Sequence, residues 1–105
     1  MTKVDEIYDK LSKKTQVSMS LRRSPEGEEL NIYVSQANGV RAEMDTGTLL
    51  VQLPKGPLSF KKDVNGNLEI GVDKDDVVKL ENWELHSVDT KGNDVIVQLR
   101  TKKNS

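Results

Sequence analysis

The sequence predicts an α+β fold that is mostly β, in which an N-terminal helix precedes an antiparallel up-and-down meander of seven or eight short strands. Apolar residues recur at helical spacing only near the N-terminus, and from residue 17 onward they alternate with polar residues. Alternation of this kind is typical of strands that bury one face. Segments rich in glycine, asparagine and proline separate the alternating stretches and indicate tight turns.

The helix is indicated by Val4, Ile7, Tyr8 and Leu11, whose spacing places them on one helical face. Acidic residues near its start and lysines near its end complement the helix dipole. We expect the helix to end near Lys14, because the spacing of apolar residues changes there from ~3.6 to ~2.

Matching of apolar faces predicts how the strands pair. Directly opposite residues of an antiparallel pair point to the same face, so their residue numbers have a constant sum. Even-length loops satisfy this rule for the turns around residues 24–27, 45–48 and 54–57. The predicted pairs are Val17 with Val34, Met19 with Ile32, Leu21 with Leu30, Met44 with Leu49, and Leu53 with Leu58.

Three further hairpins require three-residue loops that end in glycine, at residues 37–39, 64–66 and 90–92. Such loops place their last residue in the left-handed conformation, so Gly39, Gly66 and Gly92 are predicted to have positive φ. The predicted pairs are Val34 with Ala42, Ile32 with Met44, Phe60 with Ile70, Leu58 with Val72, Ser87 with Val95, Leu85 with Val97, and Trp83 with Leu99.

Face matching fails between residues 73 and 82. Val78 and Leu80 can pair with Val72 and Ile70, but this arrangement leaves Trp83 on the polar face. A β-bulge near residues 81–82 resolves the conflict, and so does a short helical turn that begins at residue 73. The sequence does not distinguish these two conformations.

A meander of this length is expected to curl into a small barrel, or into a strongly bent sheet whose open side is covered by the helix. The inner row of aliphatic and aromatic side chains is bulky enough to fill such a barrel. We therefore predict a packed core that includes Trp83 and that leaves no large ligand cavity.

Length and composition favour a single cytoplasmic domain that spans residues 1–105. The chain contains no cysteine, no N-terminal apolar segment typical of a signal peptide, and no apolar run of the ~20 residues that a membrane helix requires. We therefore expect no disulfide framework and no association with a membrane. The net charge of −1 disfavours nucleic acid as a ligand.

The residues carry no recognisable catalytic, cofactor or metal motif. Phosphate-binding, dinucleotide-binding and nucleophile-elbow sequences are absent. The single histidine, His86, is expected to face outward without a catalytic partner. Asp63, Asn65 and Asn67 are similar to the start of a calcium-binding loop but lack the Gly and Glu positions of that loop, so we interpret them as turn residues. The acidic run Asp73, Asp75 and Asp76 could hold a cation weakly but is more typical of a solvated loop or a helix start. We predict that the protein is not an enzyme and needs no cofactor or metal.

Function is therefore expected to reside on the outer sheet face, which is polar apart from Tyr33, Leu50, Val88 and Ile96. The predicted pairing places Tyr33 and Leu50 on one row and sets His86 opposite Ile96. Clustered apolar surface residues mark partner surfaces. For Val88 and Ile96 the alternative is burial under the helix. We predict a non-enzymatic protein-interaction module in which Tyr33, Leu50, His86 and Ile96 bind a protein partner or a second copy of the chain.

Two further expectations follow from composition. Small, cysteine-free, highly charged domains are typical of accessory or regulatory proteins of bacteria and their phages, and we expect this chain to be one of them. The alternative function is that of a nucleic-acid-binding small β-barrel, in which Arg22, Arg23, Lys61 and Lys62 would contact phosphates beside Tyr33.

Overall fold

The computed structural model describes residues 3–37, 39–45, 47–53, 56–62 and 64–102. In this part of the chain one helix, α1 (Lys3–Ser12), precedes nine strands. The strands are β1 (Val17–Ser24), β2 (Gly27–Ser35), β3 (Arg41–Asp45), β4 (Thr48–Leu53), β5 (Gly56–Lys62), β6 (Leu68–Asp73), β7 (Asp76–Leu80), β8 (Trp83–Lys91) and β9 (Asp94–Thr101).

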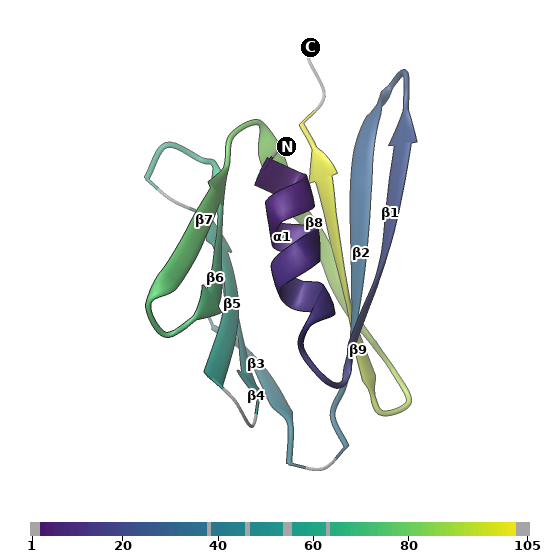
Figure 1. The fold of residues 1–105 in the computed structure, drawn as a ribbon, viewed down its shortest axis with the longest axis vertical. Helices are drawn as coiled ribbons and strands as arrows, with labels where there is room; N and C mark the ends of the chain where they lie inside the picture. Colours follow the sequence, from purple (N-terminus) through teal and green to yellow (C-terminus); the bar gives the residue numbers. More distant parts are fainter. Residues whose placement is uncertain (1–2, 38, 46, 54–55, 63, 103–105) are drawn as a thin grey trace.

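The strands form two antiparallel sheets, with α1 lying between them on one side (Figure 1). The four-stranded sheet has the order β1-β2-β9-β8, and the five-stranded sheet has the order β3-β4-β5-β6-β7. The mostly β composition and the N-terminal helix agree with the prediction, but the single meander and the closed barrel were wrong. The chain changes sheet after β2 and again after β7, and β9 inserts between β2 and β8.

Both sheets and the helix contribute to one cluster of buried apolar side chains. Val4, Ile7 and Leu11 of α1 are buried, whereas Tyr8, which was expected on the same face, is 38% exposed. The helix packs against β1 of one sheet and against β6 and β7 of the other. It therefore lies between edge strand β1 of one sheet and edge strand β7 of the other, which do not pair with each other.

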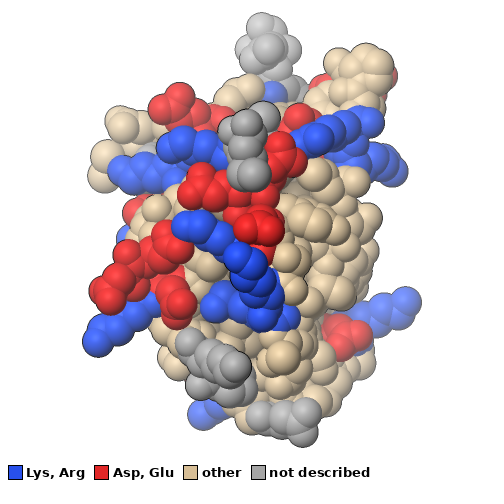
Figure 2. Space-filling model, in the orientation of Figure 1, with Lys and Arg blue, Asp and Glu red and all other residues tan. Residues whose placement is uncertain are grey.

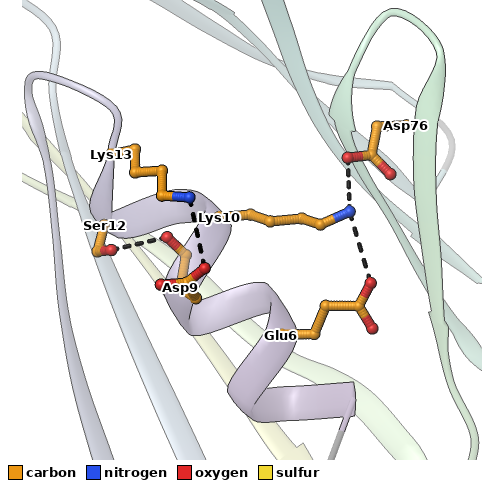
Figure 3. A network of polar contacts seen from close by, with 6 residues as sticks. All are labelled: Glu6, Asp9, Lys10, Ser12, Lys13 and Asp76. Carbon is orange, nitrogen blue, oxygen red and sulfur yellow. Dashed lines mark hydrogen bonds and ion pairs between the residues drawn. The ribbon is translucent and has the colours of Figure 1, made fainter.

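Charged contacts attach α1 to both sheets. Lys10 Nζ lies 2.6 Å from Asp76 Oδ2 on β7 and 3.5 Å from Glu6 Oε1 on the helix itself (Figure 3). The hydrogen bond to Asp76 raises the pKa of the Lys10 ammonium above its usual value, and Glu6 adds to this effect. On the other sheet, Arg23 Nη2 of β1 donates to Asp5 Oδ1 at 2.7 Å.

Short-range hairpin registers agree best with the prediction. Val17, Met19 and Leu21 stand opposite Val34, Ile32 and Leu30 as expected. Met44 stands opposite Leu49, and Phe60 opposite Ile70, also as expected. The register between β4 and β5 differs by two residues from the prediction, because Leu58 pairs with Val51 and Leu53 pairs with Gly56. Both arrangements keep the apolar side chains on the inner face.

The predicted hairpin between β2 and β3 does not form. Val34 pairs with Val17 and Val95, so neither Val34 nor Ile32 meets β3. The face-matching rule allowed this pairing but could not exclude other partners with the same parity. Gly39 has the predicted positive φ of 87° even though the connection leads from one sheet to the other.

The final hairpin also has a different register. Lys91 pairs with Asp94 across a two-residue turn formed by Gly92 and Asn93. A register shift between Leu85 and Ser87 then places Leu85 opposite Leu99, on the inner face of the sheet. Val88 consequently pairs with Val97 and packs against the core, contrary to the outward position predicted for it. A bulge inserts one residue and thereby changes the face on which later residues lie.

Residues 73–82 comprise the end of β6, a turn at residues 74–75, strand β7 and a second turn at residues 81–82, and no helical turn is present there. Val78 pairs with Ile70 and Leu80 with Leu68, two residues away from the predicted partners. The irregularity lies between Gly71 and Asp73 and not at the predicted site. Asn82, with φ of 65°, lies in the turn that takes the chain from β7 to β8 and so to the other sheet. This corner brings Trp83 into the core at 6% exposure, as predicted.

Candidate interaction face

The structure separates the residues that were expected to form one outer surface. Tyr33 on β2 stands directly opposite Ile96 on β9 in the four-stranded sheet. Leu50 lies on β4 of the other sheet, between Glu43 and Ser59. The predicted row joining Tyr33 to Leu50 was therefore wrong, because it depended on pairing between β2 and β3.

His86 occupies the irregular position between Leu85 and Ser87 on edge strand β8, and its side chain is exposed. Asp89, and not His86, stands opposite Ile96. A bulge on an edge strand disrupts the regular row of free backbone groups and so discourages unspecific strand pairing. We therefore interpret the irregularity at His86 as protection of the sheet edge.

Two rows of side chains cross the middle of the outer face of the four-stranded sheet. One row comprises Ser18, Tyr33, Ile96 and Asp89, and the other comprises Ser20, Asn31, Gln98 and Ser87. We call the seven uncharged members of these rows the uncharged patch. Only Asp89, at the β8 edge, is charged in the two rows, although 31% of the residues in the whole chain are charged.

Charged rows flank the uncharged patch on both sides. Toward one end, Arg22, Glu29, Arg100 and Glu84 alternate in sign across all the strands of the sheet. Arg22 Nη2 lies 3.7 Å from Glu29 Oε2, and Arg100 Nε lies 3.1 Å from Glu84 Oε1. Toward the other end, Asp94 stands opposite Lys91. A centre depleted in charge with a polar rim is the usual anatomy of a protein interface.

Tyr33 is the large side chain at the centre of the patch. It is 38% exposed although it lies on a central strand, because α1 packs on the opposite side of this sheet. Its cross-strand neighbour Ile96 is half-buried. Because the two residues stand directly opposite each other, their side chains are close enough to make contact. Together they form a small apolar centre on an otherwise polar face.

The amide row beside Tyr33 is partly engaged in internal hydrogen bonds. The Ser87 hydroxyl donates to Gln98 Oε1 at 2.9 Å. Asn31 Oδ1, on the neighbouring strand, is buried and has no hydrogen-bond partner. Buried polar atoms in native proteins are nearly always paired, so a lone acceptor at a surface patch requires an explanation.

The four basic residues of the nucleic-acid alternative do not form one surface. Arg23 pairs with Asp5 at 2.7 Å and with Glu28 at 3.5 Å, and Lys61, on the other sheet, lies 3.5 Å from Glu69. Arg22 pairs with Glu29 as described above. Figure 2 shows positive and negative side chains interspersed over the face that carries α1, without an extended area of one sign among the described residues. This distribution offers no phosphate-binding track on that face.

Residues of the uncharged patch were visible in the sequence as alternating serines and amides, but their grouping was not. Ser18 and Ser20 precede Tyr33 by a short turn, whereas Ile96 and Gln98 come more than sixty residues later. The pairing of β2 with β9 brings the two halves together. No feature of the local sequence indicated that pairing.

Within the described ranges, no group of three or more His, Asp or Glu side chains is arranged to hold a metal ion. None of the helical structure in these ranges has the length and apolar character that a membrane crossing requires. Comparison of the chain with protein-family models, with curated proteins and with solved structures yields no match.

Proposed function

We propose that this protein is a non-enzymatic interaction module, a small accessory or regulatory protein that binds a partner protein through the uncharged patch. One observation carries the proposal: Tyr33 and Ile96 stand opposite each other at the centre of the uncharged patch, with a row of charged side chains on one side and the pair Lys91 and Asp94 on the other. Tyrosine is enriched and charge is depleted at the centre of protein interfaces.

The exposed part of Tyr33 sets the expected contribution to binding. An aromatic side chain can bury ~150–250 Å², and 38% of that area, about 75 Å², remains exposed in the free protein. At ~25 cal/mol per Å², covering this area contributes about 2 kcal/mol, which corresponds to roughly 25-fold in Kd. A partner that donates a hydrogen bond after rotation of Asn31 would also satisfy its unpaired oxygen.

The chain supplies a matched control for this test. Tyr8 on α1 is also 38% exposed, but it lies on the helix and not on the sheet face. Partners captured from the native host by the wild-type protein are purified, and their Kd values are measured by calorimetry. We expect Tyr33→Ser to weaken binding by about an order of magnitude or more, and Tyr8→Ser to leave the Kd unchanged.

Equal affinities of Tyr33→Ser and Tyr8→Ser for the purified partner would remove the patch from consideration. If the partner is a second copy of the chain, light scattering shows a mass that rises with concentration and falls back in Tyr33→Ser. The nucleic-acid alternative predicts a different pattern, in which affinity falls steeply with salt and depends on Arg22 and Arg23 more than on Tyr33.

A further inference from the structure

The two sheets leave a second open side, opposite the one that α1 covers. There the edge strands β3 and β8 are unpaired with each other. A pocket of about 430 Å³ lies between them, lined on its apolar side by Met44, Leu68, Trp83 and Leu85. The packed core was expected to leave no large ligand cavity, and this pocket lies where the two sheets do not close.

The pocket has a buried floor and an apolar rim. Leu68 and Trp83, at 2% and 6% exposure, belong to the core, and Leu85 packs partly against it. Met44 stands opposite the buried Leu49 on the inner face, yet it is 54% exposed. A flexible methionine at a pocket mouth adapts readily to ligands of different shape.

Lys62 provides the uncompensated charge of the pocket. It follows Leu58 and Phe60 at alternate positions of β5 and stands opposite Leu68, so it continues the inner face of the strand. It forms no ion pair with any described residue, whereas its neighbour Lys61 on the outer face pairs with Glu69. Among the described residues that line the pocket, the one carboxylate is that of Glu84, and it is held by Arg100 at 3.1 Å.

We propose that this seam pocket binds a small anionic amphiphile, a carboxylic acid with a short aliphatic or aromatic body. The carboxylate pairs with Lys62 at the mouth, and the apolar body covers Met44 and Leu85 and reaches toward Leu68. The pocket volume lies within the ~300–1,000 Å³ that is typical of small-molecule sites. The site shares no residue with the uncharged patch, and the proposal does not depend on the function proposed above.

Sodium octanoate serves as the probe, and the methionine methyl groups report where it binds. The chain has three methionines. Met44 lines the pocket, while Met19 lies on β1 in the other sheet. In protein labelled with ¹³C at the methionine methyls, octanoate should shift the Met44 resonance saturably and leave that of Met19 unchanged. Trp83 also borders a second surface hollow, so its fluorescence alone would not locate the site.

Adjacent lysines provide the matched variants. Lys62→Gln should weaken octanoate binding at least about threefold, in line with the loss of one partly exposed charge pair, and Lys61→Gln should leave it unchanged. Octanol, which lacks the charge, should bind the wild-type protein more weakly than octanoate. An unshifted Met19 resonance in both variants verifies the fold.

The absence of a saturable Met44 shift would overturn the proposal. Equal effects of Lys62→Gln and Lys61→Gln, or equal affinity for octanol and octanoate, would refute the anionic specificity, because the pocket would then be only an apolar hollow. None of these results bears on binding through Tyr33.

Discussion

Replacing Ile7 with alanine tests whether α1 belongs to the folding core or merely rests on it. Ile7 is fully buried at 0% exposure, and the helix packs against β1 on one sheet and β7 on the other. If the helix joins the two sheets, a cavity at Ile7 weakens the whole molecule. If the helix is an appendage, the same cavity weakens only the helix.

The expected loss can be estimated from the buried carbon atoms. Ile7→Ala removes three carbons, which at ~0.8 kcal/mol each contribute about 2.4 kcal/mol to the transfer free energy. The remaining cavity raises the cost toward ~3–4 kcal/mol, and the better helix propensity of alanine offsets at most ~0.7 kcal/mol. The net loss of about 3 kcal/mol is a large part of the ~5–15 kcal/mol by which a domain is stable.

Urea unfolding is measured with two probes, far-UV circular dichroism for the backbone and fluorescence for Trp83, which is buried in the shared core. Tyr8→Ala is the control, since Tyr8 is the next residue on the same helix and is 38% exposed. It should change the unfolding free energy by less than ~1 kcal/mol. A loss below ~1 kcal/mol in Ile7→Ala, or an early transition that leaves Trp83 fluorescence unchanged, would show that the helix is not part of the core.

Two further stability predictions concern the final hairpin. Trp83→Ala should lower the unfolding free energy by ~3–5 kcal/mol in urea titrations, because the indole is 6% exposed and lies in the core. A stable variant, together with red-shifted fluorescence of the wild type, would contradict this placement of Trp83. Gly92→Ala should cost ~1 kcal/mol in thermal unfolding, because φ is 61° at the first position of a two-residue turn. An unchanged melting temperature would refute the turn assignment.

The positive φ of Gly92 was predicted correctly, but the register of the hairpin that contains it was not. Its positive φ was predicted from a three-residue loop, whereas the observed turn has two residues, Gly92 and Asn93. Gly92 has positive φ and Asn93 does not. Positive φ at the first central position alone is typical of a type II′ turn, which takes glycine there. The same φ therefore fits both loops, and the sign of φ does not determine the register.

The sequence by itself determined where most of the strands lie and, outside residues 73–91, which of their faces is buried. Alternation places Val17, Met19 and Leu21 on one face of their strand. Because the turn that follows is short, the next strand is their nearest possible partner. The pairing of Phe60 with Ile70 is predictable for the same reason. In such hairpins the turn length and the burial of one face fix the register, and both are local properties.

Only the tertiary structure decided which strands meet across long stretches of chain. Leu30, Ile32 and Val34 satisfy the face-matching rule equally well with β3 and with β9, and the choice of β9 depends on packing of both sheets around one core. That choice places Tyr33 beside Ile96 and moves Leu50 to another sheet. Parity is a property shared by every amphipathic strand, so it identifies the buried face but not the partner, which is selected by the free energy of the assembled core.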